Sequence, residues 1–247
     1  MSLDMIAIED GTFFMGSPSS ESGRNPDESP LTEVSISRGF WIGKTEVTQL
    51  EYETVTGLPA PSDGSGQESR GGDFPVQSVN WFQAEEFCAL LTDRERDAGR
   101  LPEGFVYSLP TEAQWEYACR AGTAARFSFG DDLDGSQLKN YAVYGVNSSI
   151  PIGGNNPRTR TVGGKLPNPW GFYDIHGNVW EWCLDFKGSF PGGVVTDPTG
   201  PLSGSTRVYR GARLSQPHHQ VRSAERAARD PGTSDCSNGF RIVLTVE

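Results

Sequence analysis

Each of the three stretches of this sequence that carry a helical pattern is short and ends at a glycine. Each begins at a Thr or Asn that can cap a helix N-terminus, and two of them add a Glu or Gln three residues later, as in a capping box. The caps are Thr48, Asn80 and Thr111, and the glycines are Gly57, Gly99 and Gly122. Glycine ends a helix readily because it adopts the left-handed conformation without steric cost. The chain is therefore restricted to short helices joined by strands and loops.

The composition favours loops that aromatic side chains hold to a core. The 247 residues include 30 glycines and 17 prolines, the hydrophobic share is 35%, and aromatic residues make up 11%. Short alternating runs predict strands within 5–16 and 31–48, before Leu109, and at both ends of 207–243. No repeat or shift of composition marks a boundary. We therefore expect a single α+β domain over residues 1–247.

The formal net charge of −11 narrows the class of partner. An acidic surface repels phosphate backbones, so we expect no nucleic-acid partner. Carboxylate oxygens do suit hard cations such as calcium. No apolar run approaches the roughly 20 residues of a membrane-spanning helix, so we expect no membrane span.

The cysteines follow neither a redox nor a zinc spacing. Cys88, Cys119 and Cys183 lie among apolar or aromatic neighbours, and Cys236 is near the C-terminus. Such surroundings favour buried free thiols, although counting cysteines leaves a disulfide open.

Six motifs in a fixed order make the chain resemble a known family. They are "GTFFMGS", "FWIGKTEVTQLEYETVTG", "FPVQSVNWFQAEEFC", "YSLPTEAQWEYACRAGT", "NPWGFYDIHGNVWEWCLD" and "RVYRGARL" followed by "RSAERAARDPG" and "NGFRIV". Together they resemble the formylglycine-generating enzyme family, or sulfatase-modifying factor domain. The resemblance implies that family's variety of the C-type lectin fold, which is loop-rich with little regular secondary structure. Because a fold does not fix a function, the site residues must decide among the family's activities.

The oxidases of this family resemble one another in a pair of cysteines that bind copper and carry the chemistry, just after the motif written here as "RGARL". No cysteine lies between Tyr209 and Asp235, and Cys236 lies beyond that position. Thiolates are the ligands that a cuprous ion prefers. We therefore expect no copper, no catalytic residues of the oxidase type and no formylglycine synthesis.

The adjacent histidines His218 and His219 do not replace that pair. His176 is the only other histidine, so a third imidazole ligand is missing nearby. The family's iron-dependent synthases place a three-histidine site in an extra helical domain, which has no counterpart in this sequence. We interpret the two histidines as ligand-contacting or solvated residues.

The motif "YDIHGNVWEW" implies, through the resemblance, a structural calcium site. Its ligands would be the side chains of Asp174 and Glu181 and the backbone carbonyls of Gly177 and Val179. Calcium takes six to eight oxygen ligands from flexible turns. The alternative is a buried salt bridge between Glu181 and Arg241. Trp180 and Trp182, also in this motif, would anchor the core or line a ligand cleft.

The C-terminal segment departs from the family pattern while its flanks keep it. Arg222, Arg226 and Arg241 are expected to form internal ion pairs with acidic core positions. The segment resembles the variable proteins of diversity-generating retroelements, which place their diversified residues here. The predicted ligand-binding residues are Arg213, Leu214, Ser215, Pro217, His218, His219, Glu225, Ala227, Arg229, Ser234 and Asp235. The alternative is that these are solvated loop residues of a diverged homologue.

Two hypotheses of function follow. The first is a non-catalytic protein, monomeric, that binds a protein or small molecule through this variable C-terminal surface. Such a protein would act outside the cytoplasm or at a cell surface, with any signal or lipid anchor outside this sequence. The second is an enzyme or enzyme-accessory protein whose chemistry does not use paired cysteines. It would need a titratable group with a shifted pKa, for which His218, His219 and Glu225 are the local candidates.

Overall fold

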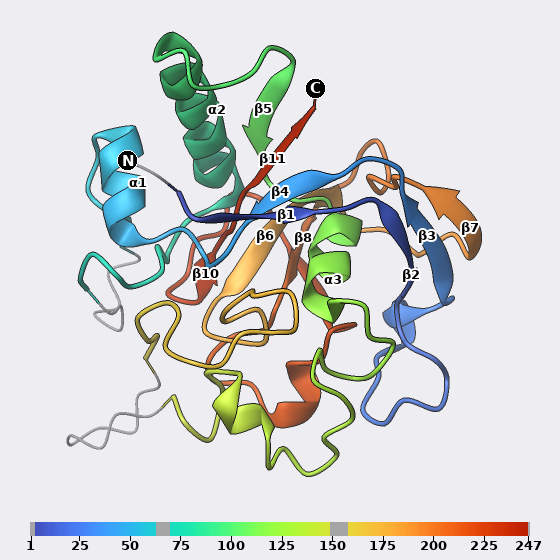
Figure 1. The fold of residues 1–247 in the computed structure, drawn as a ribbon. Coiled ribbons are helices and arrows are strands. Elements are labelled where there is room, and N and C mark those ends of the chain that lie inside the picture. Colours follow the sequence, from blue (N-terminus) through green and yellow to red (C-terminus); the bar gives the residue numbers. More distant parts are fainter. Residues whose placement is uncertain (1–2, 63–69, 149–157, 247) are drawn as a thin grey trace.

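The computed structural model describes residues 3–62, 70–148 and 158–246. Its fold consists of small sheets and short helices. The first sheet has the strand order β1 (Met5–Ile8), β4 (Phe40–Gly43), β11 (Val243–Val246) and β5 (Phe105–Ser108). All its strand pairs are antiparallel, and they bring the two ends of the chain together. In Figure 1, β1 and β4 run together across the middle of the molecule, with β11 beside β4.

The second and third sheets hold the remaining strands of the described residues. The second has the order β10 (Asn238–Gly239), β6 (Trp180–Phe186), β8 (Arg207–Arg210) and β9 (Arg226–Arg229). The third has the order β2 (Gly11–Met15), β3 (Thr32–Ile36) and β7 (Gly193–Thr196). The parallel pairs β10–β6 and β3–β7 show that these sheets are assembled from distant segments rather than hairpins alone.

The predicted helices are confirmed, as are the capping boxes predicted at Thr48 and Thr111; the cap predicted at Asn80 also forms a box, with Gln83. The helices are α1 (Gln49–Thr56), α2 (Trp81–Asp97) and α3 (Glu112–Arg120), capped by Thr48, Asn80 and Thr111. In each box the cap side chain accepts from the third helical amide, and that residue's side chain accepts from the cap amide. At the C-terminal ends, Gly57 is the left-handed cap of α1, as predicted. The caps of α2 and α3 are Ala98 and the left-handed Ala121, each one residue before the predicted glycine. Single-turn 3-10 helices lie at Pro26–Glu28, Leu138–Asn140 and His218–Gln220.

Tryptophan side chains tie separate segments to the core. The Trp182 indole donates to the carbonyl of Val79 at 2.8 Å, and the Trp81 indole donates to the carbonyl of Cys183 at 2.9 Å. Trp180 and Trp182 are both buried and both meet the ring of Tyr209 edge-on. The two tryptophans of the "WEW" motif therefore anchor the core, which is the first of the two interpretations above.

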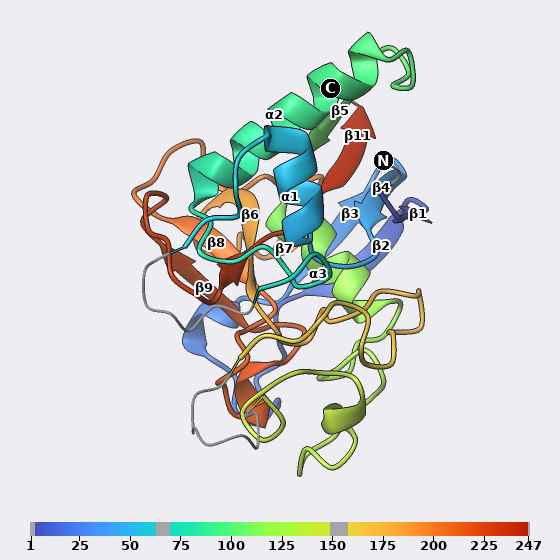
Figure 2. The same cartoon turned by 90° about the vertical axis from the view of Figure 1, so that its left-hand side faces the viewer.

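The loops gather on one side of the molecule, away from α2. In Figure 1, α2 and β5 stand at the top, and the long yellow-green loops lie at the bottom beside the orange-red turn at His218–Gln220. Figure 2 shows the same arrangement from the side, with β9 above that turn. The thiols of all four cysteines are free, and those of Cys88, Cys119 and Cys183 are buried. Among the described residues, no helix is both long and apolar enough to cross a bilayer.

Removing one helix cap should weaken the fold measurably. Thr111 accepts the amide of Gln114 at 3.1 Å, and nothing else in α3 replaces this acceptor. Thr111→Ala should lower the free energy of unfolding by about 1 kcal/mol, while Thr111→Ser should keep it nearly unchanged. Urea unfolding measures both, and equal losses in the two variants would contradict the capping role.

Candidate functional site

Buried arginines hold the C-terminal segment to the rest of the protein. We call Arg210, Arg222, Arg226 and Arg241, with the carboxylates that they pair with, the frame. Arg222 is fully buried and contacts Glu28 at 2.5 Å, Glu21 at 2.6 Å and Glu225 at 3.0 Å. The internal ion pairs predicted for three of these arginines are thereby confirmed. A buried guanidinium without such partners would be costly, so the frame fixes the backbone wherever an arginine enters the core.

The remaining frame arginines reach α3 and β6. The guanidinium of Arg226 donates two hydrogen bonds to the carboxylate of Glu112, at 2.7 and 2.5 Å. Arg210 pairs with Glu116, which also holds Arg120 at 2.8 Å. Glu112 and Glu116, in the first turn and the middle of α3, are therefore paired with arginines inside the protein. They are not available to a ligand.

The segment between two frame arginines carries the exposed residues. It begins with two left-handed residues, Gly211 and Ala212, which turn the chain out of β8. We call Arg213, Ser215, Pro217, His218 and His219 the rim. Ser215 and Pro217 are exposed, and the other three are half-buried.

The two rim histidines are supported by different loops. A methyl group at Gly135 would lie 3.2 Å from Cβ of His218, and one at Gly23 would lie 3.1 Å from Cβ of His219. The two imidazole rings are 5.6 Å apart and nearly perpendicular. Burial, and then the neighbouring cations, lowers the pKa of His219. A lowered pKa favours the neutral imidazole at His219, which can donate one hydrogen bond and accept another.

Two residues predicted to contact a ligand lie beneath the surface instead. Leu214 is only 6% exposed, and its amide donates to the carbonyl of Asn178. Glu225, also 6% exposed, accepts from Asn25 and pairs with Arg222. Burial raises the pKa of Glu225 to about 7, against the attraction of Arg222. Both residues support the rim rather than present a surface of their own.

The other predicted residues form a second group beside the start of α2. Arg229, on β9, donates to the hydroxyl of Tyr209 at 3.2 Å and pairs with Asp235. The carbonyl of Asp235 accepts from the amide of Ser78, close to the cap of α2. Ala227 is half-buried and Ser234 is exposed. The structure therefore divides the predicted surface into the rim and this β9 group, which have different neighbours.

His176 is a supporting residue that sequence reasoning did not identify. Its Nδ1 donates to the carbonyl of Val221 at 3.0 Å, and its Nε2 accepts from the amide of Ser128 at 3.2 Å. The buried ring lies edge-on to Phe127 and Phe129. Burial lowers the pKa of His176 to about 4, because an imidazolium would lose its hydration there. A neutral imidazole thus secures the chain between the rim and Arg222.

The ligand set that the resemblance implies for calcium fits only in part. Both oxygens of Glu181 accept from Arg241 at 2.7 Å, and one also accepts from the Trp115 indole at 2.7 Å. The salt bridge with Arg241 is therefore present. Asp174 has its Oδ2 bonded to the amide of Gly163, but its buried Oδ1 has no hydrogen-bond partner among the described residues. Glu181 is thus committed to a guanidinium, whereas Asp174 keeps a free oxygen.

The comparison with known families decides the identity. A model of the sulfatase-modifying factor enzyme 1-like domain matches residues 1–246. The chain belongs to this family.

Relatives of several kinds share the domain. The formylglycine-generating enzyme of Streptomyces coelicolor is 32% identical over 278 residues, which cover 96% of this chain and 87% of that enzyme. The serine/threonine-protein kinase pkn1 of Chlamydia pneumoniae is 28% identical over 268 residues, covering 98% of this chain but 38% of the kinase. The chain therefore spans well under half the length of the kinases that it matches.

A solved structure of a variable protein is also similar. Treponema denticola variable protein 1 superimposes with a TM-score of 0.79 at 30% identity, covering 97% of this chain and 94% of that chain. This member of the sulfatase-modifying factor family therefore shares its mixed α and β fold with a variable protein as well as its sequence pattern with the enzymes.

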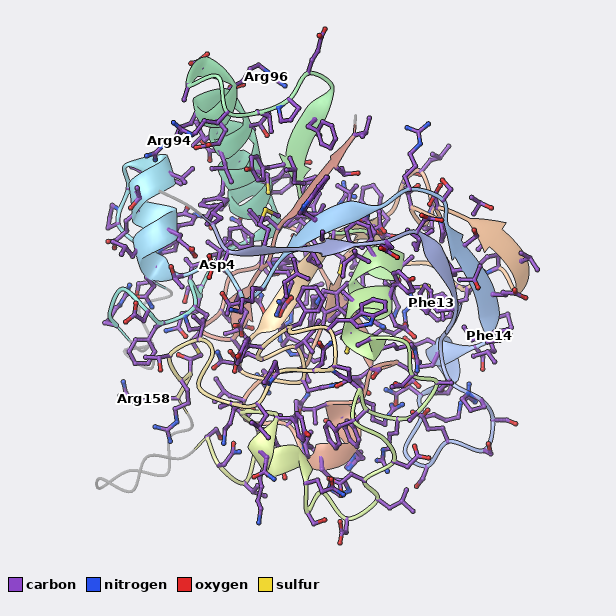
Figure 3. All side chains as sticks on the ribbon, in the orientation of Figure 1. Asp4, Phe13, Phe14, Arg94, Arg96 and Arg158 are labelled. Carbon is purple, nitrogen blue, oxygen red and sulfur yellow. The ribbon has the colours of Figure 1, made fainter. Side chains whose placement is uncertain are left out.

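Deleting one frame guanidinium should be far more damaging than deleting a surface one. Arg222→Ala leaves three buried or nearly buried carboxylates unpaired, and should lower the free energy of unfolding by about 3–5 kcal/mol. Arg96 is the matched control, because its contact with Asp93 on α2 is solvent-exposed (Figure 3). Arg96→Ala should change stability by less than about 0.5 kcal/mol. Similar losses for the two variants in urea unfolding would contradict the frame.

Protonation of His176 should destabilise the fold in acid. The pKa of His176 is about 4 in the folded protein, against an ordinary value of 6.5. The stabilisation by neutral imidazole is therefore present above pH 6.5 and is lost as the pH falls toward 4. Between pH 7 and pH 5 this group should remove about 2 kcal/mol of unfolding free energy. His176→Gln, measured by urea unfolding at both pH values, should show a correspondingly smaller pH dependence; an unchanged dependence would refute the assignment.

Proposed function

We propose that this protein is a non-catalytic ligand-binding protein that presents a variable recognition surface on a C-type lectin-like fold. The observation that carries the proposal is the division between frame and rim. The frame arginines are buried and each is paired with a carboxylate, while the rim lies between them on exposed or half-buried positions. Rim residues can therefore change without disturbing the ion pairs that hold the segment. Binding residues commonly lie on loops that a rigid scaffold positions.

The surroundings of the rim favour a macromolecular partner. The cavities of about 490, 370 and 360 Å³ in the described structure are lined by other residues. Small-molecule sites are usually concave, whereas protein partners dock on flatter surfaces. We therefore infer that the rim meets a protein surface.

Arginines in and beside the rim indicate which chemical groups that partner offers. The Nε atoms of Arg213 and Arg126 are buried and have no hydrogen-bond partner among the described residues. Arg126 flanks Gly23 together with His219, so it lies next to the rim. The cationic guanidinium groups of these arginines suit a partner's carboxylate or carbonyl oxygens, which form strong charge-assisted hydrogen bonds with arginine. Arginine is also enriched at the centres of protein interfaces.

The burial of three of the cysteine thiols supports the non-catalytic part of the proposal. Burial raises the pKa of Cys119 to about 12, so its thiol stays protonated. Cys88 and Cys183 are also buried, with pKa values raised by burial. Of the two protonation states of a cysteine, only the thiolate acts as a nucleophile or metal ligand. The one partly exposed cysteine, Cys236, has no second cysteine beside it in the sequence.

Site-specific photocrosslinking in the native host tests the binding surface. A photoreactive amino acid at Ser215 should give a discrete crosslinked protein, because this rim residue is exposed. The matched control is Leu202, which is 99% exposed and lies outside the C-terminal segment. A further rim change, Arg213→Ala, should reduce the Ser215 adduct several-fold. No adduct at Ser215, or the same adduct at Leu202, would contradict the proposed surface.

The second candidate is an enzyme or enzyme-accessory protein, favoured by the 32% identity to a formylglycine-generating enzyme. The discriminating assay incubates the purified protein with copper, oxygen and a cysteine-containing peptide, and measures aldehyde by mass spectrometry. We expect no aldehyde above the protein-free control. Aldehyde formation that is lost in Cys236→Ser would overturn the non-catalytic assignment.

A further inference from the structure

A cavity between β1 and α3 brings aromatic rings and carboxylates together. It has a volume of about 360 Å³, and none of the rim residues lines it. Its walls are residues 6–8 of β1, the following Glu9 and Asp10, Tyr117 of α3, and Trp170. In Figure 1, β1 passes beside α3. A cavity of this volume is large enough to hold a small-molecule ligand.

The two aromatic rings form a corner of this cavity. The ring centroids of Tyr117 and Trp170 are 5.0 Å apart, and the ring planes meet at 82°. Tyr117 also packs against Phe13, at a centroid distance of 5.2 Å. Tyr117 is buried and Trp170 is half-buried, so neighbouring side chains hold both rings in place. The corner is therefore present before any ligand arrives.

Gly11 allows the corner to lie next to the carboxylates. A methyl group at Gly11, the first residue of β2, would collide with the hydroxyl group of Tyr117. The absence of a side chain there lets Tyr117 reach the turn between β1 and β2, where Glu9 and Asp10 lie. Burial, and then the charges of Asp10 and Glu9, raises the pKa of Tyr117. The ring and the two carboxylates are thus close enough to interact electrostatically.

The charges around the cavity favour a positively charged ligand. Glu9 and Asp10 are exposed, and neither forms a salt bridge or a hydrogen bond within the described part of the chain. The residues that line the cavity include no lysine or arginine, so its charge is negative. Carboxylates attract a cation through their charge, and the faces of tyrosine and tryptophan rings attract it through their quadrupole. Both kinds of group in this cavity therefore select for the same ligand charge.

We propose that this cavity binds a quaternary ammonium group, held against the rings of Tyr117 and Trp170 and facing the carboxylates beside them. A quaternary ammonium carries its charge on methyl groups and has no N–H donor, so aromatic walls can replace its hydration. A primary ammonium is strongly hydrated and would lose more on entering such a corner. Ile6 and Ile8 line the same cavity and add apolar surface for the methyl groups. This inference is independent of the recognition surface proposed above.

Titration of the full chain with choline, followed by nuclear magnetic resonance, tests the site. The indole N–H signal of Trp170, assigned by its absence in Trp170→Phe, should shift saturably. The neutral analogue with carbon in place of the ammonium nitrogen has the same shape and should bind about tenfold more weakly, because only the cation is attracted. Tyr117→Phe keeps the ring and should bind choline like the wild type. A trimethyllysine peptide that binds more tightly than choline would identify a protein side chain as the source of the ammonium group.

Paired charge variants separate this site from a general attraction of cations to an acidic protein. Glu9→Gln combined with Asp10→Asn should weaken choline binding about five- to tenfold at low ionic strength. The matched control combines Asp93→Asn with Asp97→Asn, which removes two exposed carboxylates from α2 and should bind like the wild type. The proposal is wrong if choline causes no saturable shift, if the neutral analogue binds as tightly as choline, or if the two double variants lose binding equally.

Discussion

The pairing of buried arginines with buried glutamates is the interaction on which the rest of this structure depends. The C-terminal third of the chain returns to the core at Arg210, Arg222, Arg226 and Arg241, and each meets carboxylates from a distant segment. Separating the two partners of such a pair costs much free energy, because each would remain a buried charge without hydration or a counterion. The backbone is therefore fixed at these points, and the residues between them are not needed to hold the fold.

The freedom of the rim residues to vary connects the fold to the proposed binding function. The domain family includes formylglycine-generating enzymes, and a variable protein shares the fold closely. In this chain the ion pairs lie beneath the rim and not within it, so the rim residues can differ from those of the enzymes without loss of the pairs. In this chain the rim contains imidazoles, a guanidinium and a hydroxyl in place of paired thiols. These groups suit hydrogen bonding to a partner, whereas the oxidase chemistry requires sulfur.

Sequence reasoning located the local features well and the tertiary ones in part. Capping boxes at Thr48 and Thr111 were predictable because a cap depends on residues three positions apart. The arginine ion pairs were predictable in kind, but their partners, such as Glu28 for Arg222, depend on contacts 194 residues apart in the chain. Leu214 was expected to contact a ligand because it lies in the divergent segment, and Glu225 because it is a titratable residue near that segment; no local pattern marks their burial. Glu46 gave no signal, since only the fold brings its Oε1 to the side-chain amide of Asn178.

A library measurement tests the central claim most directly. One library randomises the rim positions 213, 215, 217, 218 and 219, and the other randomises the frame positions 210, 222, 226 and 241; both are sorted for resistance to protease on a display platform. We predict that most rim variants stay as resistant as the parent and that almost all frame variants are cleaved. Comparable losses in the two libraries would contradict the claim, because the exposed segment would then be as necessary to the fold as the buried arginines.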